Sequence, residues 1–138
     1  MNQYLRAFIK SVYQKPASAL DLGAGDNADV YALRADGWKC VGVDLNTGTN
    51  LEEPYLSGEA PFDLIYSNYV LHKIKNKEQF LRTVGNNLKK GGWIFLHTFD
   101  NSDTVALSDL DPERLSVMLK NVGFTCISTR LIHHYDTD

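Results

Sequence analysis

Apolar runs of strand length alternate with segments of helical period along most of this chain, and that alternation limits the fold more than any other feature. The strand-like segments lie at residues 18–22, 40–43, 62–67, 93–99 and 124–132. The helical segments lie at residues 2–14, 28–36 and 76–90, with a further helix expected to start at Asp111. Strands separated by helices pair in parallel. The sequence therefore predicts an α/β fold, a doubly wound and mostly parallel sheet with helices on both faces.

The size and composition of the chain are those of an ordinary globular domain. It has 138 residues, of which 43% are hydrophobic and 22% are charged, and we expect residues 1–138 to form one domain. The formal net charge of −3 argues against binding to nucleic acid. No apolar stretch is long enough to span a bilayer and no signal peptide is apparent, so we expect a cytoplasmic protein without a membrane anchor.

Cysteine and histidine residues give no indication of a metal site. Cys40 and Cys126 are far apart in apolar, strand-like runs, so we expect two reduced core residues. His133 and His134 are adjacent but lack a third ligand at suitable spacing. The sequence therefore predicts no metal.

A glycine-containing turn follows the first strand-like run. Gly23 and Gly25 allow a sharp turn and the close approach of a ligand, and the helix near Ala28 offers free N–H groups. Asp44 ends the second run, where a carboxylate can accept hydrogen bonds from ribose hydroxyls. In an open parallel sheet this edge binds ligands, although a tight turn without a ligand would also explain the glycines.

Four segments carry a resemblance to a known family. They are ALDLGAGDN, VGVDLN, FDLIYSNYVLHKI and LKKGGWIFLHTF, within about residues 18–100. In order and spacing they resemble the signature segments of class I S-adenosylmethionine-dependent methyltransferases. The resemblance implies a Rossmann-like fold and S-adenosylmethionine as the cofactor.

The resemblance also implies roles for individual residues. The cofactor-binding residues that it implies are Asp21, Gly23, Gly25, Asp44, Leu45, Ser67 and Asn68. Asp21 would act on the methionine amino group, directly or through water, and Asp44 would hold the ribose hydroxyls. Leu45 would lie against the adenine, and the segment from Ser67 to Tyr69 would surround the methionine and the methyl group.

The segment between the second and third runs is short. About 17 residues separate Asp44 from Phe62, too few for the usual loop, helix, strand and loop. We therefore expect a minimal version of the fold, with the helix missing and its third strand reduced. The contact to the adenine amino group then has three candidates, which are Asn50, Leu51 and Glu52.

Methyl transfer from a sulfonium depends mainly on positioning, and a base is needed only where the acceptor loses a proton. His72 follows the run that faces the expected methyl group and is our candidate base, although a structural role is equally open. Tyr69 is a candidate to shape the acceptor pocket. His97 is interpreted as a packed or hydrogen-bonded strand residue more readily than as a base.

Three functions remain open at this point. The first is methyl transfer to an unidentified acceptor, with a small molecule favoured. The second is a non-catalytic cofactor-binding module or degenerate subunit, since a free sheet edge could pair with a second copy in a homodimer or with a partner subunit. The third is a nicotinamide-dependent oxidoreductase, because Gly23, Gly25 and Ala28 also fit the loose dinucleotide pattern.

Overall fold

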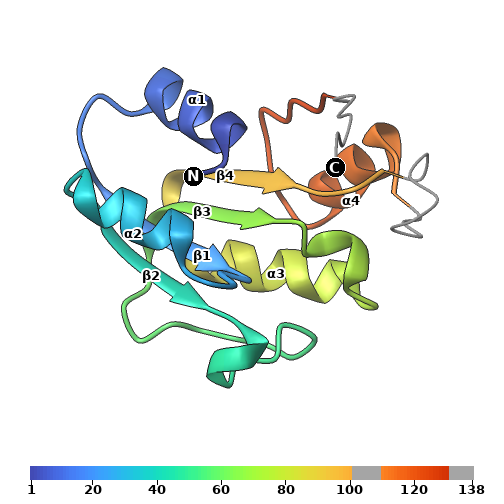
Figure 1. Cartoon of the computed structure of the whole chain (residues 1–138). Coiled ribbons are helices and arrows are strands. Elements are labelled where there is room, and N and C mark those ends of the chain that lie inside the picture. The colour runs from blue at the N-terminus through green and yellow to red at the C-terminus, as the bar shows by residue number, and fades with distance from the viewer. Residues whose placement is uncertain (101–109, 131–138) are drawn as a thin grey trace, which may run out of the picture.

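The structure is a computed structural model and describes residues 1–100 and 110–130. Its centre is a parallel sheet of four strands (Figure 1). The strands are β1 (Ser18–Leu22), β2 (Lys39–Val43), β3 (Phe62–Asn68) and β4 (Leu88–His97). Their order is β2-β1-β3-β4, so β1 lies between β2 and β3 and the order of strands reverses there. The predicted doubly wound parallel sheet is confirmed.

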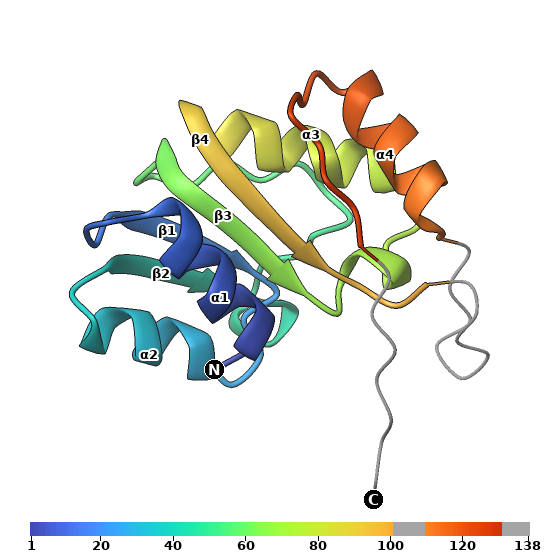
Figure 2. The same cartoon turned by 90° about the horizontal axis from the view of Figure 1, so that it is seen from above.

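Helices cover both faces of the sheet. They are α1 (Gln3–Val12), α2 (Ala28–Ala35), α3 (Lys77–Asn87) and α4 (Pro112–Asn121). Figure 2 shows α1 and α2 on one side of the sheet and α3 and α4 on the other. Each side has its own apolar core: Leu5 of α1 and Leu33 of α2 pack against Leu64, whereas Phe80 of α3 and Leu119 of α4 share a core with Ile65. The strands are therefore apolar on both faces, as their sequences indicate.

The ends of the helices follow standard capping chemistry. The Asn2 side chain accepts hydrogen bonds from the first turn of α1, and the Asp111 side chain accepts one from Arg114 N at the start of α4. Gly37 after α2 and Gly123 after α4 have φ of 94° and 98°, a backbone conformation that glycine adopts without strain. The positions predicted for α2 and for the start of α4 are confirmed to within about one residue.

The boundary between α3 and β4 differs from the prediction. The helix ends at Asn87, three residues earlier than predicted, and β4 begins directly at Leu88 and ends at His97. The Asn87 side chain is fully buried and bonds the loop before β3, accepting from Ser57 N at 2.8 Å and donating to Tyr55 O at 2.9 Å. These long-range bonds fix the end of the helix, and helical periodicity does not reveal them.

The predicted last strand, residues 124–132, is wrong as far as the structure describes it. Residues 124–130 form no strand, and residues 131 and 132 lie outside the described part. Cys126 has φ of 55° and is exposed, so the prediction that it is a core residue is also wrong, whereas Cys40 is buried as expected. Partial burial of Phe124 and Ile127 against the α3–α4 core explains the apolar pattern without a strand.

The segment after β2 is as reduced as its length predicts. A short 3-10 turn, η1 (Leu45–Thr47), follows Asp44, and residues 48–61 form no helix or strand. The expected third strand of the family fold is therefore absent from this segment, which leaves β2 at the edge of the described sheet.

Candidate cofactor and acceptor site

The loop after β1 is bonded to the end of β2 through its main chain. Gly23 N and Ala24 N both donate to Val43 O, at 2.8 and 2.9 Å. Gly23 has φ of 92°, and a Cβ built there would lie 2.3 Å from Val70 Cγ2. Position 23 therefore requires glycine for its conformation and also for its close approach to the segment after β3.

Asp44 joins the glycine loop to η1. Its Oδ2 atom accepts a hydrogen bond from Gly25 N at 3.0 Å, and its Oδ1 atom accepts one from Asn46 N at 3.0 Å. Each carboxylate oxygen can accept a second bond, so the group retains capacity for two hydroxyls. Leu45, which follows, is 70% exposed and therefore open to a flat ligand.

Asp21 is buried at the end of β1, on the side of the sheet that α1 and α2 cover. Burial raises the pKa of its carboxyl from 3.8 to about 7, and the negative charges of Asp29 and Asp44 add to that rise, while a hydrogen bond from Tyr66 opposes it. The carboxylates of Asp29 and Asp44 thus both repel the charged form of the Asp21 carboxyl. A bound cation would relieve this repulsion, so the residues present fit a ligand with positive charge, such as the ammonium and sulfonium groups of S-adenosylmethionine.

Tyr66 is the partner of Asp21 that the sequence analysis missed. It is fully buried on β3, directly across from Asp21, and its hydroxyl lies 3.5 Å from the Cys40 sulfur on β2. Burial also raises the pKa of the Cys40 thiol to about 11. Only the pairing register of the three strands would have revealed this cluster.

Ser67 and Asn68 end β3 and use their side chains differently. The buried Ser67 hydroxyl donates to Leu22 O at 2.8 Å, so this side chain ties β3 to β1. Asn68 Nδ2 donates to Asp29 Oδ2 at 3.1 Å, and Asn68 Oδ1 accepts from Asn2 Nδ2 at 3.2 Å. Asn2 and Asp29 carried no signal in the sequence, because neither lies in a signature segment.

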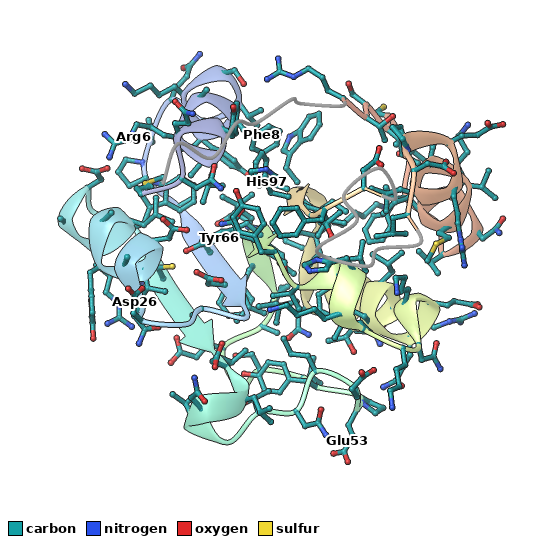
Figure 3. The ribbon with its side chains drawn as sticks, turned by 45° about the vertical axis from the view of Figure 1, so that its right-hand side comes forward. Arg6, Phe8, Asp26, Glu53, Tyr66 and His97 are labelled. Carbon is teal, nitrogen blue, oxygen red and sulfur yellow. The ribbon has the colours of Figure 1, made fainter. Side chains whose placement is uncertain are left out.

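Aromatic rings gather beside Asn68, where β3 and β4 end. Tyr69 has φ of 62°, and its main-chain N donates to His97 O at 2.6 Å. Its ring lies 4.6 Å from the His97 ring and 5.0 Å from the Phe99 ring. Figure 3 labels Tyr66 in the middle of the sheet and His97 closer to α1. Two further rings, those of His97 and Phe99, therefore lie beside Tyr69, the candidate to shape the acceptor pocket.

His72 lies on the far side of this ring group, in the short turn η2 (Leu71–Lys73). It is buried, its main-chain N donates to Thr98 Oγ1 at 3.0 Å, and its Nδ1 lies 3.2 Å from the same oxygen. The His72 ring meets Phe99 edge-on at 5.0 Å. Phe99 thus contacts both Tyr69, the candidate to shape the acceptor pocket, and His72, the candidate base.

The three adenine candidates have different surroundings. Leu51 is buried in the core on the α3 side, and the Glu52 carboxylate accepts from Lys75 N at 3.1 and 3.2 Å. Asn50 is exposed, and its side chain accepts from Glu52 N at 3.0 Å. Asn50 is therefore the candidate with the most accessible side chain.

Within residues 1–100 and 110–130, no group of three or more histidine, cysteine, aspartate or glutamate residues could hold a metal ion. The same part of the chain contains no helix long and apolar enough to cross a membrane. His133 and His134 lie outside the described residues.

Sequence comparison assigns the family. A family model described as a methyltransferase domain matches residues 1–138. The chain belongs to this methyltransferase family. No curated protein sequence matches the chain significantly. Membership confirms the resemblance seen in the four signature segments and favours an S-adenosylmethionine-dependent methyltransferase over the nicotinamide alternative.

Solved structures of other methyltransferases share this methyltransferase's fold. The 1,6-didemethyltoxoflavin-N1-methyltransferase of Burkholderia thailandensis has a TM-score of 0.75 and 22% identity, over 93% of this chain and 69% of that one. Phosphoethanolamine N-methyltransferase 2 of Haemonchus contortus has a TM-score of 0.67 and 19% identity, over 91% of this chain and 37% of that one. A methyltransferase in complex with the Haloferax volcanii Trm112 methyltransferase activator has a TM-score of 0.67 and 13% identity, over 87% of this chain and 66% of that one. The first two are complexes with S-adenosylhomocysteine.

Proposed function

We propose that this methyltransferase transfers the methyl group of S-adenosylmethionine to a small acceptor molecule at the carboxyl ends of β3 and β4. One observation carries the proposal: the cofactor candidates and the aromatic group are adjacent at the end of β3. Asn68 belongs to the network of Asp29, and the next residue, Tyr69, belongs to the ring group with His97. A cofactor beside Asn68 would thus have its reactive end next to the rings.

Four features support the cofactor-binding role. The buried Asp21 carboxylate would attract the methionine ammonium group, and Gly23 and Gly25 would let the main chain approach it. Asp44 would accept from the ribose hydroxyls, and the exposed Leu45 would lie against the adenine. When bound, S-adenosylmethionine supplies a methyl group already activated by the sulfonium charge. The protein's task is then to orient the acceptor.

The rings favour a small acceptor. Tyr69 and Phe99 are 39% and 36% exposed, so each offers part of an aromatic face to a ligand. Two of the similar structures hold small molecules, 1,6-didemethyltoxoflavin in one and phosphomonomethylethanolamine in the other. In this proposal Tyr69 shapes the acceptor pocket.

The chemistry would be an in-line displacement. A lone pair on the acceptor would form the new bond to the methyl carbon as the carbon–sulfur bond breaks with its electron pair left on sulfur. The residues at the ends of β3 and β4 would therefore have to hold the acceptor in line with that bond. An acceptor that carries a proton on its nucleophilic atom must lose it, and His72 would accept that proton. The contacts of His72 with Thr98 would hold its ring in place for this step.

The proposal is tested first by binding. S-adenosylhomocysteine should raise the melting temperature, because a ligand that binds only the folded state stabilises it. NAD at the same concentration should not, and the opposite ranking would contradict the proposal. A radiolabelled methyl-transfer screen against native extract, separated into small molecules and macromolecules, should then find label in the small-molecule fraction.

A second candidate, a non-catalytic module that acts with a partner, is distinguished by the same screen. It has support in the similar methyltransferase whose solved structure is a complex with an activator protein. Cofactor binding without transfer to any fraction would favour it. In either case we propose that residues 1–138 act as one domain in the cytoplasm.

A further inference from the structure

The side-chain amide of Asn2 connects the start of α1 to the ends of β3 and β4. Its Nδ2 atom lies 2.9 Å from His97 Nδ1 and 3.2 Å from Asn68 Oδ1. The main-chain N of Asn2 donates to Asp29 Oδ1 at 3.0 Å. This one residue therefore contacts the cofactor side of the site through Asn68 and the acceptor side through His97.

The orientation of the Asn2 amide is fixed by the helix that it caps. Its Oδ1 atom accepts from Tyr4 N at 2.9 Å and from Leu5 N at 3.0 Å. A main-chain N–H can only donate, so the oxygen of the amide must face the helix. The nitrogen must then face His97.

The opposite end of the network requires the same orientation. An ionised carboxylate can only accept, so Asn68 must present Nδ2 to Asp29 Oδ2, 3.1 Å away. The Asn68 oxygen is then left to accept from Asn2 Nδ2. The helix cap at Asn2 and the carboxylate of Asp29 are independent constraints. Both require that Asn2 Nδ2 donates to Asn68 Oδ1.

His97 Nδ1 therefore accepts a hydrogen bond. A neutral imidazole has one N–H, so a ring that accepts at Nδ1 carries its proton on Nε2. Three aromatic rings lie against the His97 ring: Tyr4 of α1 at 5.4 Å, Tyr69 at 4.6 Å and Phe95 of β4 at 6.4 Å. The carboxylate of this network, Asp29 of α2, bonds to Asn2 and Asn68.

We propose that Asn2 is a positioning residue that holds His97 as the Nε2–H tautomer, so that His97 offers the acceptor a hydrogen-bond donor and leaves proton removal to His72. The role toward the acceptor rests on the proposed function, whereas the tautomer does not. A donor at this position selects acceptors with a lone pair near the methylated atom, such as a carbonyl oxygen or an aromatic ring nitrogen.

The variant Asn2→Asp tests the positioning role while keeping the helix cap. A carboxylate oxygen still accepts from Tyr4 N and Leu5 N, but the other oxygen now faces His97 Nδ1 and cannot donate. The ring should respond by carrying a proton on Nδ1. Asn76→Asp is the matched control, because Asn76 caps α3 by accepting from Gln79 N at 3.1 Å.

The readout is the ¹⁵N NMR signal of the histidine rings, assigned by loss of one set in His97→Gln, with thermal melts to show that each variant folds. We expect His97 Nδ1 to be unprotonated in the original protein and in Asn76→Asp, and protonated in Asn2→Asp at the same pH. An Nδ1–H tautomer in the original protein, or no change in Asn2→Asp, would overturn the role of Asn2.

Turnover tests the role of His97 separately. A glutamine amide can place an N–H near the position of Nε2, so His97→Gln should retain turnover within about tenfold if His97 acts as a donor. A loss like that expected for a general base, about 10²-fold or more, would overturn the donor role. If the original protein transfers no methyl group, the proposed function fails and the acceptor role of His97 fails with it, but the tautomer measurement still decides the role of Asn2.

Discussion

The two halves of the candidate site are built from different chemical groups, main-chain N–H groups in one and side chains in the other. At the ends of β1 and β2, main-chain groups make the contacts: the N–H groups of Gly23, Ala24 and Gly25 bond to Val43 O and to the Asp44 carboxylate. At the ends of β3 and β4, side-chain amides and aromatic rings from separate segments make them, as Asn68 and the ring group do.

This difference has consequences for function. A site built from main-chain N–H groups has the same shape whatever most neighbouring side chains are, which suits a cofactor common to a whole family. A site built from side chains changes with each substitution, which suits a variable acceptor. We therefore expect substitutions in the two halves to separate into effects on cofactor binding and effects on turnover.

The largest effect is expected for Gly23→Ala. The substitution forces a side chain into a backbone with φ of 92° and places its Cβ 2.3 Å from Val70 Cγ2. The strained conformation costs about 1–2 kcal/mol and the overpacking about 1–3 kcal/mol. The free energy of unfolding should therefore fall by about 2–5 kcal/mol, as urea denaturation would measure, and S-adenosylhomocysteine binding should be lost.

Gly123→Ala separates the two causes. Gly123 has φ of 98°, but a Cβ there would meet no atom within 4 Å. The free energy of unfolding of Gly123→Ala should fall only by the cost of the strained conformation, about 1–2 kcal/mol. The variant should bind S-adenosylhomocysteine normally. Equal losses in the two variants would mean that the contact with Val70 relaxes and does not fix the loop.

The next largest effect is expected for His72→Asn on the acceptor side. The asparagine amide can still bond Thr98 Oγ1 from about the position of Nδ1 but cannot accept a proton. For an acceptor that must lose a proton, turnover should fall by about 10²–10⁴-fold. Calorimetric titration should show nearly unchanged affinity for S-adenosylhomocysteine. Unchanged turnover on the acceptor found by the screen would remove His72 from the mechanism.

The third prediction concerns Asp21 on the cofactor side. Replacing its carboxylate by the amide in Asp21→Asn removes the negative charge expected to hold the methionine ammonium group. Charged hydrogen bonds are worth about 1.5–3 kcal/mol, so affinity for S-adenosylhomocysteine should fall by about 10- to 100-fold. Binding to the original protein should release protons near pH 7, because a cation favours the carboxylate form. Titrations in buffers of different ionisation enthalpy measure that release, and it should vanish in Asp21→Asn.

The same substitution should change how stability depends on pH. The pKa of Asp21 is raised from 3.8 to about 7, so the folded protein binds the proton more tightly than the unfolded chain does. The contribution of Asp21 to stability is thus fully present below about pH 4 and is lost as the pH rises to about 7. Over that range the free energy of unfolding should fall by up to about 4 kcal/mol. Asp21→Asn should remove that decline. Asp63→Asn is the contrast, since the Asp63 pKa is lowered and its contribution is lost as the pH falls.

The places of the glycine loop and of Asp44 in the fold were the more predictable from sequence, because their signals are local. The glycines of the loop and Asp44 are near strand ends that periodicity locates, and they occur in recognisable segments. The acceptor half depends on contacts between distant positions: Asn2 lies 27 residues from Asp29, 66 from Asn68 and 95 from His97. No pattern within a short window contains such pairs.

The errors in the predicted fold have a similar cause. The end of α3 is set by the bonds of Asn87 to Ser57 and Tyr55, which are 30 and 32 residues away. The residues from Phe124 to 130 have a strand-like composition but pair with no strand in the described chain, since their apolar side chains contact the core from a loop. Periodicity reports which residues are apolar and does not report what they pack against.

The last prediction concerns Asp44→Ala, and the structure changes how its effect must be measured. The Asp44 carboxylate should accept two hydrogen bonds from the ribose, and partial replacement by water should limit the loss of affinity to about 10- to 100-fold. Sequence alone suggests little loss of stability. Since the carboxylate also accepts from Gly25 N and Asn46 N, we expect a cost of about 1–2 kcal/mol from the lost cap as well.

Thr47→Val separates the cap from the ribose contact. The Thr47 hydroxyl accepts from Asp44 N at 3.1 Å and donates to Asp44 O at 3.0 Å, so its removal weakens the turn but leaves the carboxylate in place. Calorimetric titration with S-adenosylhomocysteine and thermal melts of both variants complete the test. Thr47→Val should melt lower but bind nearly normally, whereas Asp44→Ala should lose affinity even at a temperature where it is fully folded. If the two variants lose affinity equally, Asp44 acts only by shaping the turn, and the ribose assignment on which the cofactor half depends is wrong.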